Sequence, residues 1–188
     1  ARFNVLDGLA PGDASSYAGA LNVRYGEVDG AELVEKAAEK TMNGRNPKVV
    51  EAGSYDVLLE PEAVAELLEW LGYVGFSSRA IEDESSFLTG RVGERITGEK
   101  VTIIDDGPAQ HGFGLPAPFD GEGTPKKTMT LIDAGIGRGG VYDRTSGARE
   151  GCASTGHAPI GNSAFGGDAV PSNLLMQSGD AARDDDDG

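Results

Sequence analysis

The side chains best suited to hold a transition metal are the two histidines and the single cysteine, His111, Cys152 and His157. Four residues separate Cys152 from His157, a spacing that allows both to bind one zinc ion, with His111 as a third ligand. Because the chain has one cysteine, the paired thiolates of a structural zinc site are excluded. Zinc at these three residues is therefore kept as an alternative.

A hydroxyl nucleophile is the second chemical possibility. Ser154, Thr155 and Gly156 directly precede His157, which places hydroxyl groups beside an imidazole. Neighbouring residues of an extended chain point to opposite faces, and no Gly-x-Ser-x-Gly elbow is present. The pattern favours a turn in which side chains bond to the backbone.

Two further patterns indicate no chemistry. The glycine-rich stretch 135–140 lacks the Lys-Ser/Thr of a phosphate-binding loop, and we interpret it as part of a hairpin. Adjacent carboxylates, such as Asp105 and Asp106, could bind a hard cation. In so acidic a chain we expect these pairs on the surface.

Apolar periodicity predicts the helices that surround these residues. Residues 31–42 carry an apolar stripe at helical spacing, and Asn43-Gly44 ends the helix. Residues 61–73 begin with Pro61, a favourable first helical residue. The expected buried face of this second helix comprises Ala63, Val64, Leu67, Leu68 and Leu71.

The remaining chain is rich in strands and loops. Short apolar runs predict strands at residues 20–27, 54–60, 100–104, 128–132, 136–142 and 173–176. Asp133-Ala134-Gly135 predicts a hairpin turn, whereas residues 144–168 are expected to form a loop. The sequence therefore predicts an α+β fold, in which an antiparallel sheet packs against a few helices.

The chain is expected to form one main domain. We predict a loop-rich lead-in with one strand at residues 1–30, the domain at 31–180 and an acidic tail at 181–188. The chain has 31 acidic and 16 basic residues, so direct nucleic-acid binding is not expected. It has no run of about 18 apolar residues, which predicts no membrane span. Its first residues do not resemble a signal peptide, so a cytoplasmic location is expected.

Five motifs, in order along the chain, resemble the TldD/PmbA family, the "modulator of DNA gyrase" proteins. They are SYDVLLEPEAVAELLEWL (54–71), SSFLTGRVGERI (85–96), FDGEGTPKKTMTLIDAGI (119–136), GVYDRTSGAREGCASTGHA (140–158) and PSNLLMQSGD (171–180). The resemblance covers roughly residues 31–180 and implies the α+β fold of the family's C-terminal domain. Family members are longer than 188 residues, which implies that this chain is a fragment.

The resemblance also implies which branch of the family is present. The TldD branch is a zinc metalloprotease with a His-Glu-x-x-x-His motif, and here Pro61, Glu62 and Glu66 occupy the three named positions. Both imidazole ligands are replaced, so the chain resembles the PmbA or TldE-like branch, with neither catalytic residues nor metal. The loop Ser154, Thr155, Gly156 and His157 also fits that branch.

The implied function is that of a non-catalytic subunit. It would pair with a TldD-like metalloprotease that holds the zinc, and the pair would act on peptides or unfolded proteins. One alternative is an active metallopeptidase with its metal elsewhere, at His111, Cys152 and His157. Another is a stand-alone protein that binds peptides or modulates gyrase.

The net charge of −15 favours a protein adapted to high salt, and this can be tested. Like charges on one small domain repel, and the screening length falls from about 10 Å at 0.1 M salt to about 3 Å at 1 M. We expect the thermal midpoint to rise steeply between about 0.1 and 2 M KCl. A flat or falling midpoint across that series would exclude the halophilic interpretation.

Overall fold

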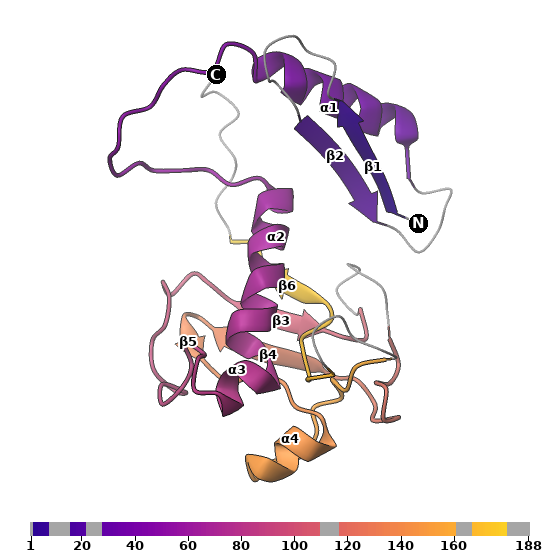
Figure 1. Ribbon diagram of the computed structural model, residues 1–188, viewed down its shortest axis with the longest axis vertical. Helices are drawn as coiled ribbons and strands as arrows, with labels where there is room; N and C mark the ends of the chain where they lie inside the picture. Colours follow the sequence, from indigo (N-terminus) through magenta and orange to yellow (C-terminus); the bar gives the residue numbers. More distant parts are fainter. Residues whose placement is uncertain (1, 8–15, 22–27, 110–116, 161–166, 180–188) are drawn as a thin grey trace. The chain divides into compact units, whose positions relative to one another are not determined.

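The structure is a computed structural model that describes residues 2–7, 16–21, 28–109, 117–160 and 167–179. The chain divides into two compact units, Ala1–Glu62 and Ala63–Gly188 (Figure 1). The predicted tail at 181–188 lies outside the described residues, and the predicted domain boundaries stay predictions.

The first unit pairs a β-hairpin with one helix. Strands β1 (Arg2–Asp7) and β2 (Ser16–Leu21) are antiparallel, and helix α1 (Gly30–Asn43) contacts both. Asp29 caps α1 by accepting hydrogen bonds from the amides of Ala31 and Glu32. The helix predicted at 31–42 is thus confirmed. The strand predicted at 20–27 overlaps β2, and residues 22–27 lie outside the described residues.

The second unit begins with a helical region that covers a sheet. Helix α2 (Pro61–Leu71) confirms the predicted helix, and the π-helical turn η2 (Gly72–Phe76) continues it into α3 (Ser78–Glu82). Phe76 packs edge-on against Phe87, with ring centroids 5.4 Å apart. A Cβ atom at Gly75 would lie only 2.2 Å from the Phe87 ring, so this approach requires glycine.

The sheet is fully antiparallel, with the order β5-β4-β3-β6. Its strands are β3 (Ile103–Asp106), β4 (Thr128–Asp133), β5 (Ile136–Gly137) and β6 (Leu174–Met176). Leu68 of α2 shares one core with Ile103, Leu131 and Ile132 of the central strands, so α2 covers one face of this sheet (Figure 1). The predicted α+β fold with an antiparallel sheet is confirmed.

Several local predictions need correction. The strand predicted at 100–104 begins later, at Ile103, and the one predicted at 136–142 ends at Gly137. The hairpin turn is present, and Ala134 and Gly135 have positive φ angles of 45° and 82°. Residues 144–168 are not entirely loop, because α4 (Arg144–Arg149) forms there. Asp143 and Ser146 stabilise it through a capping box that the prediction overlooked.

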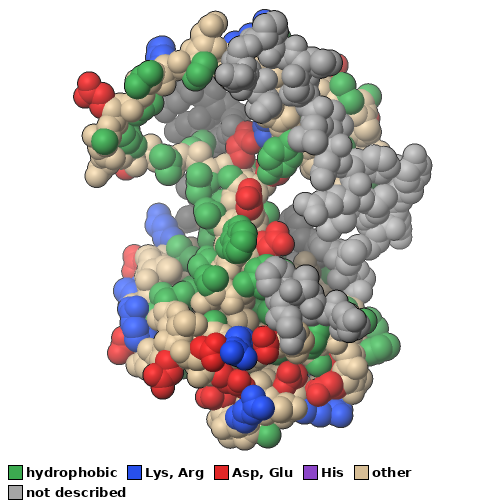
Figure 2. Space-filling view, in the orientation of Figure 1, with side chains coloured by type: hydrophobic (Ala, Val, Ile, Leu, Met, Phe, Trp, Pro, Cys, Tyr) green, Lys and Arg blue, Asp and Glu red, His purple; other side chains and the backbone are tan. Residues whose placement is uncertain are grey.

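The surface of the second unit carries charges of both signs. Figure 2 shows Asp and Glu side chains interspersed with Lys and Arg, and the ion pairs include Arg79–Asp83 and Arg138–Asp133. Exposed pairs of this kind stabilise a fold by only about 0–1 kcal/mol each. No helix in the described part of the chain is long and apolar enough to cross a membrane.

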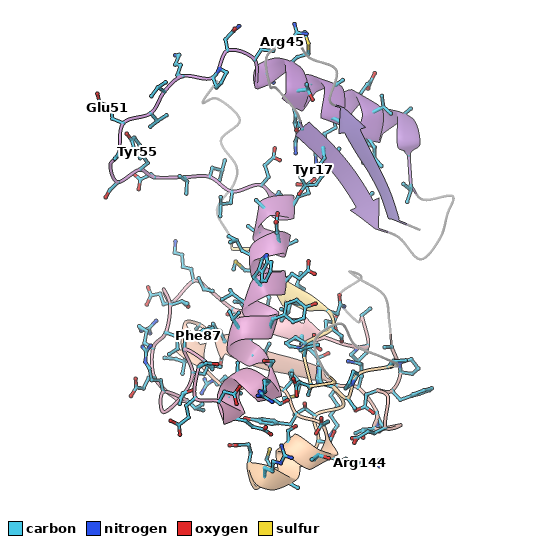
Figure 3. All side chains as sticks on the ribbon, in the orientation of Figure 1. Tyr17, Arg45, Glu51, Tyr55, Phe87 and Arg144 are labelled. Carbon is cyan, nitrogen blue, oxygen red and sulfur yellow. The ribbon has the colours of Figure 1, made fainter. Side chains whose placement is uncertain are left out.

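The segment between α1 and α2 is not the strand that its sequence predicts. Residues 54–60 adopt no regular secondary structure and run as an extended, exposed chain into α2. Tyr55 marks this segment in Figure 3. The prediction is wrong in this structure because a strand needs a hydrogen-bonded neighbour, and no described strand pairs with these residues.

The buried face of α2 is narrower than expected, and this generates a stability prediction. Leu68 is 4% exposed and Leu67 is 53% exposed, so the assignment of Leu67 to the core was wrong. We expect Leu68→Ala to lower the free energy of unfolding by about 2–5 kcal/mol, because it leaves a cavity against β4. Leu67→Ala, the matched control, should cost less than about 1 kcal/mol. Urea denaturation of both variants checks this; equal effects would contradict it.

Candidate functional site

A buried polar network lies at the end of β3, in the centre of the sheet. Asp105 and Asp106 are 0% and 1% exposed, so the expectation that this pair lies on the surface was wrong. Strands β4 and β6 flank β3 on both sides, which removes these carboxylates from water. A buried carboxylate requires hydrogen-bond partners, and both residues have them. Asp106, for example, accepts a bond from the Thr128 hydroxyl at 3.0 Å.

Asp105 joins three separate segments. One carboxylate oxygen, Oδ1, accepts the backbone N–H groups of Ser172 and Asn173, each at 2.7 Å. The other, Oδ2, lies 2.7 Å from Nε2 of His157, whose side chain is fully buried. The carboxylate therefore connects β3 to the loop before β6 and to the loop that carries His157.

The hydrogen bonds of Asp105 also determine its charge state. Burial alone would raise the pKa of Asp105. The hydrogen bond and charge of His157, with the amides of Asn173 and Ser172, outweigh burial and hold that pKa below its usual value. The ionised carboxylate is thus the form that the fold stabilises.

The second ring nitrogen of His157 completes the network. Nδ1 lies 2.9 Å from the Thr155 hydroxyl, which also lies 3.0 Å from the Tyr142 carbonyl and accepts the Tyr142 amide at 2.7 Å. The hydroxyl has one hydrogen for two acceptors. If it donates to Tyr142, His157 must donate through both nitrogens and is charged. If it donates to Nδ1, the imidazole is neutral, so rotation of one hydroxyl accommodates either state.

Asp105, His157 and Thr155 follow the order carboxylate, imidazole, hydroxyl that hydrolases use for a nucleophile. The surroundings do not fit that role, because His157 is fully buried and the Thr155 oxygen already bonds to the backbone of Tyr142. Ser154 makes the predicted turn contacts, donating to the Tyr142 carbonyl at 3.3 Å and accepting from the Gly156 amide at 3.1 Å. The arrangement holds loops together and exposes no activated hydroxyl.

A second carboxylate fixes the opposite side of the His157 loop. Asp120 accepts the amides of Glu122 and Thr124 through Oδ1 and that of Ala158 through Oδ2, at 2.8–3.0 Å. Burial opposes ionisation, but these three amides outweigh it and lower the pKa of Asp120. The loop is therefore held by one carboxylate at His157 and by another at the next residue.

A partly buried lysine faces both carboxylates. Lys126 Nζ donates to the Ser172 hydroxyl at 2.6 Å. Burial lowers the pKa of Lys126, although Asp105 and Asp120 attract its charge and oppose this effect. Lys126 thus places a cation beside the two anions of the network.

The alternative zinc ligands are not brought together. Cys152 is exposed, and both ring nitrogens of His157 already have hydrogen-bond partners. His111 lies outside the described residues. Among the residues that the structure does describe, no group of three or more His, Cys, Asp or Glu could hold a metal ion.

The residues predicted to form a degenerate metal motif lie at the start of α2. Pro61 is the first helical residue, Glu62 follows it, and Glu66 is exposed one turn later. Glu62 binds Lys36 of α1 at 2.8 Å. This hydrogen bond lowers the pKa of Glu62 and raises that of Lys36. The carboxylate at the predicted glutamate position of the motif is thus held in an ion pair.

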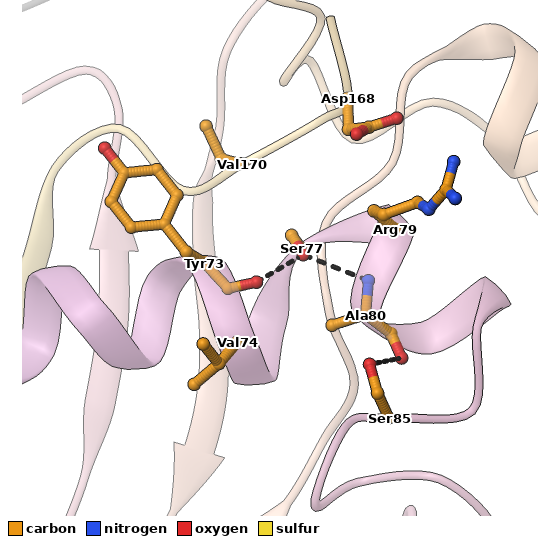
Figure 4. Close-up of a pocket in the computed structure, with 8 residues that line it drawn as sticks. All are labelled: Tyr73, Val74, Ser77, Arg79, Ala80, Ser85, Asp168 and Val170. Atoms are coloured by element: carbon orange, nitrogen blue, oxygen red, sulfur yellow. Dashed lines mark hydrogen bonds between the residues drawn. The ribbon is translucent and has the colours of Figure 1, made fainter. Parts of the chain in front are cut away.

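A shallow pocket of about 370 Å³ opens beside α3, and sequence reasoning gave no indication of it. Figure 4 shows its lining by Tyr73, Val74, Ser77, Arg79, Ala80, Ser85, Asp168 and Val170. Ser77 and Ser85 donate their hydroxyls to backbone carbonyls, and Arg79 pairs with Asp83 at 2.6 Å. These three polar groups are therefore already bonded within the fold.

A model of the PmbA/TldA metallopeptidase C-terminal domain matches residues 52–186. The chain belongs to the TldD/PmbA family. This match includes α2, the sheet and the His157 loop, and it confirms the family resemblance found in the sequence. TldD/PmbA proteins are related to metallopeptidases, and that relationship extends to this chain.

Curated relatives come from archaea and bacteria. The protein MJ0231 of Methanocaldococcus jannaschii is 33% identical over 140 residues, which cover 73% of this chain and 33% of that protein. A metalloprotease of Methanothermobacter thermautotrophicus is 30% identical over 159 residues, 82% of this chain and 33% of its own length. A metalloprotease TldD homolog of Haemophilus influenzae is 36% identical over 125 residues, with coverages of 66% and 24%. The chain thus spans about a third or less of these relatives.

Solved structures share the fold. A Thermotoga maritima protein described as a modulator of a DNA gyrase superposes with a TM-score of 0.76 and 24% identity, over 88% of this chain and 37% of that one. TldE from Thermococcus kodakarensis gives a TM-score of 0.68 and 24% identity, over 95% and 40%. At this identity the likeness shows the fold alone.

Loss of Asp105 should destabilise the protein strongly. We expect Asp105→Asn to lower the free energy of unfolding at pH 7 by about 3–5 kcal/mol, because it removes a buried carboxylate that two amides and the His157 imidazole contact. Asp133→Asn, in an exposed pair with Arg138, is the control and should cost less than about 1 kcal/mol. Urea denaturation measures both; an Asp105→Asn variant as stable as the parent would refute the role assigned to this network.

Acid should weaken the same network. Since the folded pKa values of Asp105 and Asp120 lie below the unfolded value of about 3.9, their stabilisation is complete above that pH. It is lost as pH falls through the folded values. The parent should therefore lose stability below about pH 4, and Asp105→Asn should lose less over the same range. Parallel denaturation series in both proteins would test this, and equal slopes would contradict it.

Proposed function

We propose that this chain is part of a PmbA/TldE-like, non-catalytic subunit. In this proposal it pairs in the cytoplasm with a TldD-like zinc metalloprotease, and the pair acts on peptides or unfolded proteins. The chain itself requires no cofactor, and zinc belongs to the partner. The names of its relatives, which include metalloproteases, a TldD homolog and TldE, support this choice.

One observation carries the proposal, namely that Pro61, Glu62 and Glu66 occupy the predicted metal-motif positions of α2. A zinc protease of this kind needs two imidazoles five residues apart on a helix, with a glutamate that activates water. Pro61 has no donor atom to offer, Glu66 is exposed, and the Glu62 carboxylate is paired with Lys36. One carboxylate at this position does not form a catalytic zinc site.

Exposed apolar residues on α2 support an association with another subunit. Leu67 and Trp70 of α2 and Val74 of the adjoining turn η2 are each more than half exposed and follow one another at helical spacing. The Trp70 ring packs edge-on with Tyr73, at 6.5 Å between centroids. Contiguous exposed apolar side chains, tryptophan above all, are typical of protein interfaces. We assign this apolar face of α2 to the TldD-like partner.

The other two functions have weaker support. A peptidase with zinc at His111, Cys152 and His157 would have to disrupt the bonds of His157 to Asp105 and Thr155. A gyrase modulator is suggested by the description of the Thermotoga maritima structure. With a net charge of −15, such a protein would act on gyrase through protein contacts and not through DNA.

The pairing and the metal content can be tested together. The chain alone should hold no stoichiometric zinc after dialysis against a mild chelator and should cleave no peptide, because the imidazole ligands are missing. It should co-purify with a subunit that contains His-Glu-x-x-x-His. Metal analysis and tagged co-purification check both points. One equivalent of retained zinc would support the metallopeptidase alternative.

A pair of variants locates the interface. Trp70→Glu places a charge in the apolar face of α2 and should weaken co-purification by at least about tenfold. Ile160→Glu alters an apolar residue outside α2 that is also more than half exposed, and it should leave co-purification unchanged. Equal retention of both variants would exclude α2 as the contact surface.

A further inference from the structure

The pocket beside α3 has an apolar side and a charged side. Tyr73, Val74 and Val170 line the apolar side, and Asp168 and Arg79 lie opposite them (Figure 4). The cavity of about 370 Å³ is small for a ligand site but admits one long side chain. A group that fills this pocket therefore needs an apolar body and a polar end.

The pocket forms where the helical hydrogen-bonding pattern changes. The π-helical turn η2 contributes Tyr73 and Val74, and turns of this kind are rare and frequently lie at functional sites. The Ser77 hydroxyl donates to the Tyr73 carbonyl at 2.6 Å and accepts the Ala80 amide at 3.1 Å. These two bonds fix the junction of η2 and α3, so the apolar wall is in place before anything binds.

The charges at this pocket are not fully balanced. Arg79 is paired with Asp83 at 2.6 Å, and Glu82 is paired with Arg149 at 3.1 Å. Asp168 is the fifth charged residue of the group, and no described residue forms a hydrogen bond or ion pair with its carboxylate. Its charge acts on Arg79 at longer range, adding to the larger effect of Asp83 that raises the pKa of Arg79. The two ion pairs therefore leave the negative charge of Asp168 uncompensated.

The chemistry of the two sides selects arginine as the occupant. Its guanidinium can donate two parallel hydrogen bonds to one carboxylate, and both oxygens of Asp168 are without a donor from the described residues. Its aliphatic stem can lie along Val74 and Val170 while the charged end reaches Asp168. A purely apolar side chain would instead bury this carboxylate without a partner, which is costly.

We propose that the pocket between η2 and α3 binds an arginine side chain of the TldD-like partner. This rests on the proposed function, because it specifies a contact within the pairing named there. Val74 lines the pocket and also belongs to the exposed apolar residues assigned to that partner, so the pocket continues the same surface. A second copy of this chain is a poorer source, since each copy has a net charge of −15 and two copies repel.

The selectivity for a cation can be measured on the chain alone. The probe is N-acetyl-arginine amide, and its matched control is N-acetyl-citrulline amide, which has the same length and shape but a neutral end. In NMR titrations, the amide signals of Tyr73, Ala80 and Val170 should shift saturably with the arginine probe, with a dissociation constant of roughly millimolar size. The citrulline probe should bind at least about fivefold more weakly, and Asp168→Asn should abolish this difference.

A charge reversal tests the partner as the source of the arginine. Asp168→Lys places a cation in the pocket and should reduce co-purification of the TldD-like subunit by at least about tenfold. Asp133→Lys makes the same charge change at a half-exposed carboxylate of β4 and should leave co-purification unchanged. Circular dichroism checks that each variant keeps the fold.

Three results would overturn the proposal. Equal binding of the two probes, or a preference for arginine that survives Asp168→Asn, would show that Asp168 does not select a cation. Full co-purification with Asp168→Lys would show that the partner does not use the pocket, even if the arginine probe binds there. Failure of the unaltered chain to retain a TldD-like subunit would instead refute the proposed pairing, and with it the source named here. The titration is independent of that subunit and separates this failure from a failure of the pocket to bind guanidinium.

Discussion

The buried carboxylate of Asp105 is the constraint on which the second unit depends. An ionised carboxylate inside a sheet is costly unless nearly every lone pair finds a donor. Asp105 meets this requirement with two amides before β6 and one imidazole from the loop at 154–158. None of these donors is local in sequence, so satisfying one charge brings together segments 52 to 68 residues away along the chain.

This network shows how a site can have the parts of a hydrolase without its reactivity. His157 lies between a carboxylate and a hydroxyl, but its ring is fully buried, and Thr155 is held by the backbone of Tyr142. Catalysis needs the same contacts with one group free to meet substrate. The polar chemistry of this network therefore serves the fold, and the proposed contact with a partner lies instead on exposed apolar residues of α2.

Local signals explain which predictions succeeded. Residues 31–42 and the turn at Ala134-Gly135 follow from periodicity and turn chemistry within a few residues, and the structure confirms both. The burial of Asp105 could not be predicted in this way, because it depends on β6, which lies about seventy residues later in the chain. The Asp–His contact needed the same long-range information. The family resemblance succeeded because five ordered motifs carry more information than any one residue pattern.

The strand prediction at 54–60 failed for another reason, the lack of a neighbouring strand. Its alternation is as clear as that of β4, yet β4 lies between two other strands and residues 54–60 lie beside none that the structure describes. A β-strand forms only beside another strand, because its hydrogen bonds and half of its burial come from that neighbour. The alternation at residues 54–60 therefore reports strand propensity alone, and no strand in the described part of the chain pairs with it.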